Sequence, residues 1–281
     1  MNTPPYPHLR ELASALPQAP GVYLFYGNST LPLYIGKSVN IRTRVLSHLR
    51  AADEARMLQQ TQRFDFQLTA GDMGALLLEA QLIKQHQPLY NYKLRRNRQL
   101  CAWRFNQGTL ELVQAKTVNF AQTPHLYGLY ASRHSALQGL RALADQHQLC
   151  YAAVGLEKPT GTRGCFRFML KQCRGVCCGH ETPAQHNLRL AEALQTLAIQ
   201  TWPYSGPIAL HEKATQPVLS QPRQQWHVVH NWCYLGSAAT QKAATKLAQV
   251  EPSFDADGYQ ILCKPIVMNQ LPIVEMVATA S

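Results

Sequence analysis

The sequence lacks long apolar stretches, is poor in acidic residues, and has no signal-peptide pattern. No apolar run approaches the ~20 residues that span a bilayer. Residues 1–20 contain prolines but no apolar core typical of a signal peptide, so we expect a cytosolic protein without a membrane segment. The 281 residues include 16 acidic residues and 27 lysines and arginines, which gives a net charge of +11. This surplus indicates an anionic partner, and nucleic acid, an acidic membrane face and an acidic protein all stay open on charge alone.

The N-terminal third predicts a β-hairpin followed by helices and one further strand. Apolar, aromatic segments on both sides of the turn-rich residues 27–30 indicate two paired strands. A basic helix is expected at about 39–50, with Ser38 or Asn40 as its N-cap. Its buried stripe is predicted to comprise Ile41, Val45, Leu46 and Leu49, with Arg44 and His48 on another face. Further along, a half-buried strand at 63–69 and a helix at 73–87, ended by Pro88, are predicted.

Glu79 is the one acidic residue within the apolar part of that last helix. Leu76, Ala80 and Ile83 lie around it at helical spacing, so its face should be largely apolar. Burying an unpaired carboxylate is costly, and Glu79 is therefore expected to find a cation. An ordinary salt bridge or a position at the rim is the plain alternative to a metal site.

Several short motifs in this region resemble the GIY-YIG nuclease family. The name-giving tripeptides are Gly21-Val22-Tyr23 and Tyr34-Ile35-Gly36, and the match continues in order through Lys37, Arg44, Glu79 and Asn91. Within that family the chain is most similar to the N-terminal nuclease of UvrC and to its short homologues. The resemblance implies a small, mainly antiparallel sheet flanked by helices.

The resemblance also implies a role for each matching residue. Glu79 would hold one Mg²⁺ or Mn²⁺ ion, Arg44 would sit beside the phosphate, and Tyr34 would act as general base or orient the water. A free tyrosine titrates near ~10, so a base needs its phenolate stabilised, which nearby Lys37, Arg44 and the metal could do. The other expected site residues support the centre: Tyr23 by hydrogen bonding, Lys37 and His48 by positioning phosphate or water, and Asn91 by bracing. Plainer alternatives are cross-strand packing for the tyrosines, a phosphate anchor for Arg44 and a surface position for His48.

Residues 84–104 carry cations and aromatic residues without any acid. Such a mixture suits a phosphate backbone and exposed bases, although a solvated basic linker is equally consistent. The predicted DNA-binding residues are Lys93, Arg95, Arg96 and Arg98.

Five cysteines fall between residues 150 and 178. Four of them have the spacing C-x14-C-x7-C-x3-C and are Cys150, Cys165, Cys173 and Cys177, with Cys178 expected to be a spectator. Closely grouped cysteines in a cytosolic chain indicate a bound metal, against the alternative that small thiols fill a core. Zinc is the default, but paired C-x2-C motifs are missing. The matching cysteines of UvrC are associated with a four-iron, four-sulfur cluster, so the resemblance favours a 4Fe-4S cluster over Zn²⁺.

The rest of the chain carries less chemistry. Strands are predicted at 110–115, 126–130, 226–229 and 233–235, and helices at 135–146, 183–200 and 240–249. Residues 255–258 (Asp-Ala-Asp-Gly) indicate a turn more than a metal loop. The predicted class is α+β, with a lead-in at 1–16, the GIY-YIG domain at 17–98, a linker and cysteine-cluster domain at 99–182, and an α+β extension at 183–281.

The function implied by the resemblance is a monomeric endonuclease of nucleotide excision repair and the SOS response. It would make one cut, 3′ to a lesion, in damaged double-stranded DNA marked by UvrB, which UvrA loads; the tail has too few carboxylates for a second nuclease centre of the kind that full-length UvrC carries. Two alternatives stay open: a UvrB-independent, structure- or sequence-specific nuclease, and a non-catalytic DNA-binding or redox-sensing module built on the cysteines.

Overall fold

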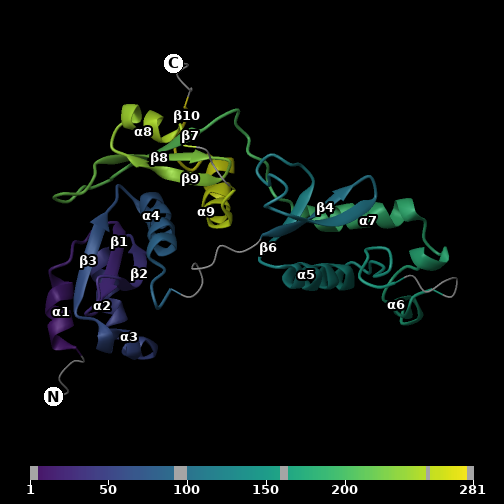
Figure 1. Cartoon of the computed structure of the whole chain (residues 1–281), viewed down its shortest axis with the longest axis horizontal. Helices are drawn as coiled ribbons and strands as arrows, with labels where there is room; N and C mark the ends of the chain where they lie inside the picture. Colours follow the sequence, from purple (N-terminus) through teal and green to yellow (C-terminus); the bar gives the residue numbers. More distant parts are fainter. Residues whose placement is uncertain (1–5, 92–99, 159–163, 251–253, 277–281) are drawn as a thin grey trace. The chain divides into compact units, whose positions relative to one another are not determined.

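The computed structural model describes residues 6–91, 100–158, 164–250 and 254–276 (Figure 1). The chain forms two compact units: Met1–Arg96 together with Pro203–Ser281, and Asn97–Trp202. Small antiparallel sheets mixed with helices confirm the predicted α+β class. Among the described residues, no helix has the length and apolarity to cross a membrane.

The N-terminal part of the first unit is a three-stranded antiparallel sheet in the order β2-β1-β3. Helices precede, connect and follow its strands: α1 (Pro7–Ser14), β1 (Gly21–Tyr26), β2 (Pro32–Ser38), α2 (Ile41–His48), η1 (Ala52–Glu54), α3 (Ala55–Gln60), β3 (Arg63–Leu68) and α4 (Asp72–His86). Asn40 is the N-cap of α2, accepting a hydrogen bond from the backbone of Thr43.

The central strand β1 is buried on both faces, which explains why its sequence is apolar without alternation. Tyr23 and Phe25 pack with residues of α1, α2 and α3 on one face. Val22 and Leu24 pack on the other face with Leu82 and Ile83 of α4. The helix that carries Glu79 is therefore anchored directly on the central strand.

The first unit also contains a four-stranded antiparallel sheet in the order β10-β7-β8-β9. We call its strands and two helices the C-terminal module: β7 (Ile208–Lys213), β8 (Gln224–His230), β9 (Cys233–Ala238), α8 (Gln241–Leu247), α9 (Ala256–Val267) and β10 (Ile273–Glu275). The turn predicted at 255–258 is wrong. Asp255 instead caps α9, its carboxylate accepting from the backbone of Asp257 and Gly258. Helix α9 packs against α4.

The second unit is built on a sheet in the order β5-β4-β6. Its elements are β4 (Cys101–Asn106), β5 (Thr109–Gln114), β6 (Leu126–Tyr130), α5 (Arg133–Gln146), α6 (Phe166–Met169), η3 (Val176–Cys178) and α7 (Pro183–Gln195). Its core joins Trp103 of β4, Leu140 of α5 and Leu194 of α7. Helix α7 ends at Gln195, five residues before the predicted end at 200, and Ala198 then forms an isolated bridge with Tyr127.

Candidate active site and cysteine site

The hairpin places two tyrosines on one face of the first sheet. The ring centroids of Tyr23 in β1 and Tyr34 in β2 are 6.2 Å apart, and Phe25 and His48 complete a cluster of rings. The Tyr23 ring crosses the backbone of Gly36, where an added Cβ would lie 2.3 Å from the tyrosine hydroxyl oxygen. Glycine is therefore required at position 36 by the space that Tyr23 occupies, and the two tripeptides fit each other.

A hydrogen-bonded chain runs from Tyr23 through His48 to Glu54. The Tyr23 hydroxyl lies 2.7 Å from His48 Nε2, and His48 Nδ1 is hydrogen-bonded to a carboxylate oxygen of Glu54. Burial lowers the pKa of His48, against an opposing effect of Glu54, so the ring is neutral at pH 7. A neutral imidazole satisfies both contacts when its Nδ1–H donates a hydrogen bond to Glu54 and its Nε2 accepts one from the Tyr23 hydroxyl.

The position of His48 corrects one prediction. His48 is 2% exposed and lies in the aromatic cluster, whereas the periodicity of the helix placed it with Arg44 away from the buried stripe. Arg44 itself is exposed. The two residues on α2 therefore differ in burial, although both interact with Tyr23.

Arg44 brings a positive charge to the tyrosines without making them bases. The interaction with Tyr23 raises the pKa of Arg44, which keeps the guanidinium charged. Burial raises the pKa of both tyrosines above the ordinary value, and the charge of Glu79 raises that of Tyr34 further, while Arg44 opposes the shift. Both phenols are therefore protonated at neutral pH in the protein alone, and a phenolate would need an additional cation.

Glu79 lies on α4, which packs against β2. Its Oε1 accepts a 3.0 Å hydrogen bond from the backbone N–H of Lys37. Burial raises the pKa of this carboxyl, against the opposing effects of Lys37 and Arg44. Among the described residues no lysine or arginine side chain forms an ion pair with Glu79. A half-buried carboxylate with lone pairs left over, near two hydroxyls, is a donor set that fits one hard divalent cation.

Lys37 joins β2 to α4 twice. Besides its backbone contact with Glu79, its ammonium lies 2.8 Å and 3.1 Å from the two carboxylate oxygens of Asp72. Asp72 is the first residue of α4, where a negative charge is favourable at the positive end of the helix. In this arrangement the Lys37 ammonium faces an acid, and a phosphate would have to compete with Asp72 for it.

Asn91 follows α4 and fastens the returning chain to β2. Its side-chain oxygen accepts from the backbone N–H of Ile35 at 2.9 Å, and its amide nitrogen donates to the Ile35 carbonyl at 2.8 Å. Ile35 lies between Tyr34 and Gly36, so this double contact fixes the backbone directly beside both residues. The four predicted DNA-binding residues, Lys93, Arg95, Arg96 and Arg98, lie outside the described residues.

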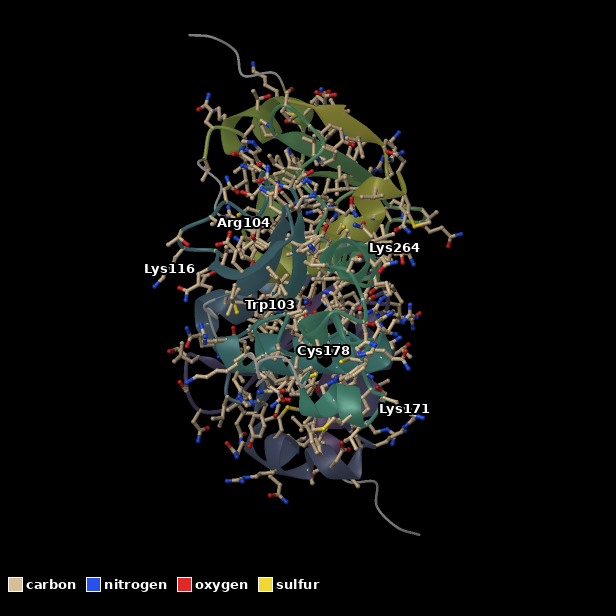
Figure 2. All side chains as sticks on the ribbon, turned by 90° about the vertical axis from the view of Figure 1, so that its right-hand side faces the viewer. Trp103, Arg104, Lys116, Lys171, Cys178 and Lys264 are labelled. Carbon is tan, nitrogen blue, oxygen red and sulfur yellow. The ribbon has the colours of Figure 1, made fainter. Side chains whose placement is uncertain are left out.

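Three of the four predicted metal-binding cysteines, Cys150, Cys165 and Cys177, have sulfur atoms within 4.8 Å of one another in the second unit, and Cys173 lies near Cys165. Sγ of Cys165 lies 3.9 Å from Sγ of Cys150 and 3.5 Å from Sγ of Cys173, and Sγ of Cys177 accepts from the backbone of Cys165 at 3.3 Å. The thiol of Cys178, which is labelled in Figure 2, donates to the Gly175 carbonyl. Burial raises the pKa of Cys173 and of Cys177 to about 12. Such thiols become thiolates only when a metal compensates their charge, so this donor set suits a soft or borderline metal centre.

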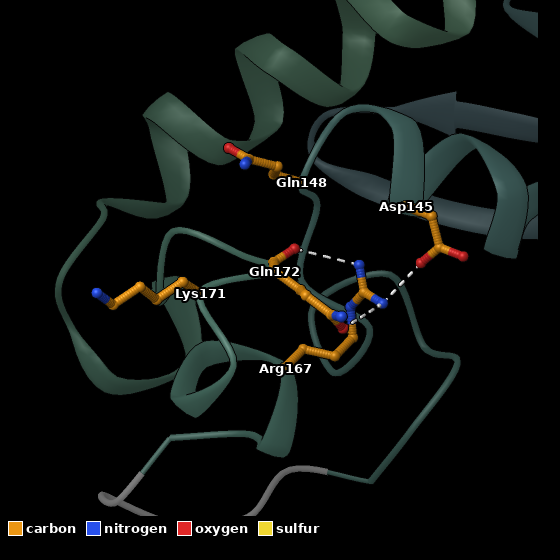
Figure 3. Close-up of a pocket in the computed structure, with 5 residues that line it drawn as sticks. All are labelled: Asp145, Gln148, Arg167, Lys171 and Gln172. Atoms are coloured by element: carbon orange, nitrogen blue, oxygen red, sulfur yellow. Dashed lines mark hydrogen bonds and ion pairs between the residues drawn. The ribbon is translucent and has the colours of Figure 1, made fainter.

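The second unit also has a pocket of about 430 Å³, lined by Asp145, Gln148, Arg167, Lys171 and Gln172 (Figure 3). The Arg167 guanidinium lies 2.6 Å from a carboxylate oxygen of Asp145 and donates to the Gln172 carbonyl at 3.1 Å. Its charge is therefore neutralised inside the unit. Lys171 points away from this group of contacts in Figure 3 and is exposed.

Three family models match the chain in succession. They are the UvrC-like GIY-YIG domain over residues 19–92, the UvrC/Cho excinuclease middle domain over 91–196, and the excinuclease Cho C-terminal domain over 207–280. Excinuclease cho of Salmonella typhi is 51% identical over 96% of this chain and 91% of its own length. The chain belongs to the UvrC/Cho excinuclease family. The resemblance seen in the motifs is confirmed, and the chain is a DNA-repair nuclease of the GIY-YIG class.

Other relatives extend the comparison. Excinuclease cho of Escherichia coli K12 is 50% identical over 96% of this chain and 90% of its own length. UvrABC system protein C of Aster yellows witches'-broom phytoplasma is 32% identical over 61% of this chain and 29% of its own length. The crystal structure of the N-terminal endonuclease domain of Thermotoga maritima UvrC, bound to magnesium, is 29% identical, covers 30% of this chain and 97% of that domain, and has a TM-score of 0.28.

Three acidic residues in the first unit were not foreseen from sequence: Glu54, Asp72 and Glu212. Glu54 lies six residues after His48, in a segment whose helical pattern gives no sign of a hydrogen bond back to α2. Asp72 comes directly before the helix predicted at 73–87, and nothing in the local pattern indicates its contact with Lys37. Glu212 forms two hydrogen bonds with α4, to Met73 and Gly74, which precede it by 139 and 138 residues. Local sequence patterns give no information on contacts over such separations.

Proposed function

We propose that this nuclease makes a single incision 3′ to a lesion in damaged double-stranded DNA, on a substrate marked by UvrB after loading by UvrA. The observation that carries the nuclease part of the proposal is geometric: the ring centroids of Tyr23 and Tyr34 lie 6.2 Å apart on one face of the sheet, and Glu79 of α4 is held to β2 by the backbone of Lys37. Phosphodiester hydrolysis needs a positioned water, a cation for the phosphate and help for the leaving oxygen, and this arrangement can provide them. The family resemblance supports the UvrB-dependent cut on the 3′ side.

Glu79 would hold one divalent cation, Mg²⁺ or Mn²⁺, with its free lone pairs. When bound, the ion would neutralise charge on the phosphate and the leaving oxygen. Arg44 is exposed and permanently charged, so it would bind a non-bridging phosphate oxygen from the side of α2. Because its pKa is raised, Tyr34 would first orient the attacking water through its hydroxyl, and would act as general base only once added positive charge lowers that pKa.

The remaining site residues would hold these groups in place. His48 Nε2 accepts a hydrogen bond from the Tyr23 hydroxyl, which fixes the direction of that hydroxyl beside Tyr34. Asn91 holds β2 through Ile35, and Lys37 sets the distance between β2 and Glu79. Lys37 would also meet a phosphate if one displaced Asp72.

The DNA track and the partners belong to the same proposal. Lys93, Arg95, Arg96 and Arg98 would contact the phosphate backbone, supported by the net charge of +11. We also propose a cytoplasmic location, a monomeric state and a role in the SOS response.

The decisive experiment uses an end-labelled duplex with one bulky adduct. Protein and magnesium are added with and without UvrA, UvrB and ATP, and the cut is mapped at nucleotide resolution. We expect one UvrB-dependent nick on the 3′ side of the adduct. Cutting that ignores the adduct and UvrB would leave a structure-specific nuclease without the pathway, and binding without cutting would favour a non-catalytic module.

For the cysteines we propose a metal centre held by Cys150, Cys165, Cys173 and Cys177. The family resemblance favours a 4Fe-4S cluster. Zn²⁺ is the second candidate, because thiolates at about 2.3 Å from one tetrahedral ion lie roughly 3.8 Å apart, close to the 3.9 Å and 3.5 Å of two sulfur pairs. Three of the four sulfur atoms, those of Cys150, Cys165 and Cys177, lie within 4.8 Å of one another, and Cys173 is outside that group. A four-iron cluster binds each thiolate to a different iron and needs wider spacing.

Metal analysis of protein purified without oxygen separates the two centres. About four irons with inorganic sulfide and visible absorbance would establish the cluster, and one zinc without colour would establish the single ion. Cys165→Ser should lose the metal in either case. Cys178→Ser is the matched control and should keep it, because the Cys178 thiol bonds to Gly175 instead.

A further inference from the structure

The N-terminus of α4 is capped by a carboxylate from another part of the chain. Glu212 in β7 accepts hydrogen bonds from the backbone N–H groups of Met73 and Gly74, both at 2.9 Å, one with each carboxylate oxygen. These are the second and third residues of α4, whose amides an N-cap side chain normally satisfies. The residue at the N-cap itself is Gly71, which has no side chain to do so. A negative charge at this position is also favoured by the helix dipole.

Glu212 is fixed in turn by a buried network within the C-terminal module. His227 Nε2 lies 3.0 Å from Glu212 Oε2, His227 Nδ1 lies 2.6 Å from Ser237 Oγ, and the Tyr234 hydroxyl lies 2.6 Å from the same serine oxygen. His227 is fully buried. The order Ser–His–Glu resembles a hydrolase triad, but both Glu212 oxygens already accept helix amides. The network therefore holds the carboxylate in place instead of activating the serine.

Two glycines make room for this contact. A Cβ at Gly71 would lie 2.3 Å from Glu212 Oε1 and 2.6 Å from its carboxyl carbon. A Cβ at Gly74 would lie 2.9 Å from Gln225 Oε1 and 3.0 Å from His227 Cε1. The φ of Gly71 is −164°, which any residue can adopt, so glycine is needed there for space and not for backbone conformation.

The module holds α4 at a second point as well. The ammonium of Lys84 lies 2.5 Å from Asp255 and 3.1 Å from Asp257, both at the start of α9. Glu79 lies between the capped residues 73–74 and Lys84 on the same helix. The loop before α4 is bound too, since Gln225 accepts from the backbone of Ala70 at 2.8 Å.

We infer that the C-terminal module is a clamp for α4, with Glu212 as its main positioning residue for Glu79. The inference rests on the proposed function in so far as Glu79 is the metal-holding residue. The module supplies the cap that the nuclease sequence lacks, so the axial position of α4 against β2, and with it the site of Glu79, depends on residues 208–275. Removal of the cap should slow the chemical step while DNA affinity is retained, because no DNA-facing residue proposed above belongs to the module.

The test is a double-mutant cycle in the full chain with Gly71→Ala and Glu212→Ala. When Glu212 is intact, the new methyl group of Gly71→Ala displaces its carboxylate. Each single variant should therefore lose the same contact between Glu212 and the start of α4. We expect hydrogen exchange of the Met73 and Gly74 amides to rise roughly ten- to a hundredfold in either, and kcat for nicking to fall with KM for DNA within about twofold. When Gly71→Ala is added to Glu212→Ala, exchange and kcat should hardly change further, because the Glu212 atoms that would clash with the new methyl group have already been removed.

Two more variants separate positioning from general stability. Glu275→Gln, an exposed acid in β10 of the same module, is the matched control and should leave exchange and kcat unchanged. Glu212→Gln keeps one acceptor and should restore part of the kcat lost in Glu212→Ala. The inference of a clamp is wrong if the effects of the two single variants simply add. It is also wrong if the melting temperature falls without a change in kcat. The exchange measurement needs no DNA, so it tests the cap even if the proposed incision is wrong.

Discussion

Two glutamates contribute to α4 in different ways, and their electrostatic surroundings shift their pKa values in opposite directions. Glu79, on α4 itself, receives one hydrogen bond from the part of the chain that the structure describes, from Lys37, and burial raises its pKa. Glu212, which reaches α4 from β7, is 7% exposed, yet two backbone amides and His227 outweigh burial and lower its pKa. The number of donors, not the depth of burial, separates the two. A satisfied carboxylate stabilises a fold, whereas an under-satisfied one keeps lone pairs for a cation.

The largest expected difference appears when each glutamate is replaced by glutamine. Glu79→Gln should lower the rate of magnesium-dependent nicking about a hundred- to a thousandfold, because it removes the charge that would hold the ion. Its free energy of unfolding should stay the same or rise, since a poorly solvated charge is removed while the acceptor for Lys37 is kept. Single-turnover nicking and urea unfolding check both parts. A variant that cuts at the wild-type rate would exclude Glu79 as the metal-holding residue.

Glu212→Gln should show the reverse balance. We expect a loss of about 2 kcal/mol in the free energy of unfolding, because one helix amide loses its charged acceptor in a buried place. Urea denaturation of the two glutamine variants side by side measures this. If Glu79→Gln is the less stable of the two, the contrast between a structural and a functional carboxylate is wrong.

A smaller effect should appear in acid. Since the folded-state pKa of Glu212 is lowered, its contribution to stability is fully present above the unfolded value of about 4.3 and is lost as pH falls through the folded pKa. The difference in unfolding free energy between wild type and Glu212→Gln should therefore be constant near neutrality and shrink below about pH 4. Thermal or urea unfolding between pH 7 and pH 3 follows it, and a difference that stays constant down to pH 3 would contradict the assignment.

The same contrast shows what the sequence can reveal. The hairpin, α2 and α4 were predictable because their apolar spacing and turn residues are local signals, and Tyr23, Tyr34, Arg44 and Glu79 could be named from motif resemblance. The burial of His48 was not predictable from periodicity. One helical face cannot show that a ring will enter an aromatic cluster and find Glu54.

Contacts over long sequence separation account for most of what was missed. Gly71 and Gly74 look like an ordinary helix start in the sequence, and their purpose becomes visible only when Glu212, Gln225 and His227 occupy the space beside them. Likewise Asp255 and Asp257 suggested a turn or a metal loop, but Asp255 caps α9 and both aspartates pair with Lys84. Local pattern carries no information on partners more than a hundred residues away.

The smallest expected effect concerns the histidine between the tyrosine and Glu54. His48 is faced by Tyr23 and Tyr34 from the sheet, by Arg44 from its own helix and by Asp53 and Glu54 from η1. Protonation of His48 would remove the acceptor for the Tyr23 hydroxyl, so nicking should fall as pH drops through the His48 pKa, which burial places below its ordinary value.

Glu54→Gln tests this relay, because Glu54 raises the pKa of His48. Removing the charge should move the acid limb of the pH–rate profile to lower pH by about half a unit to one unit, with the rate at pH 7 within about tenfold of wild type. Asp53→Asn is the matched control: it removes a charge that acts on His48 without a hydrogen bond, and should shift the limb less, in the same direction. A limb that stays in place in Glu54→Gln would mean that another group controls it, and that Tyr23 does not depend on a neutral His48.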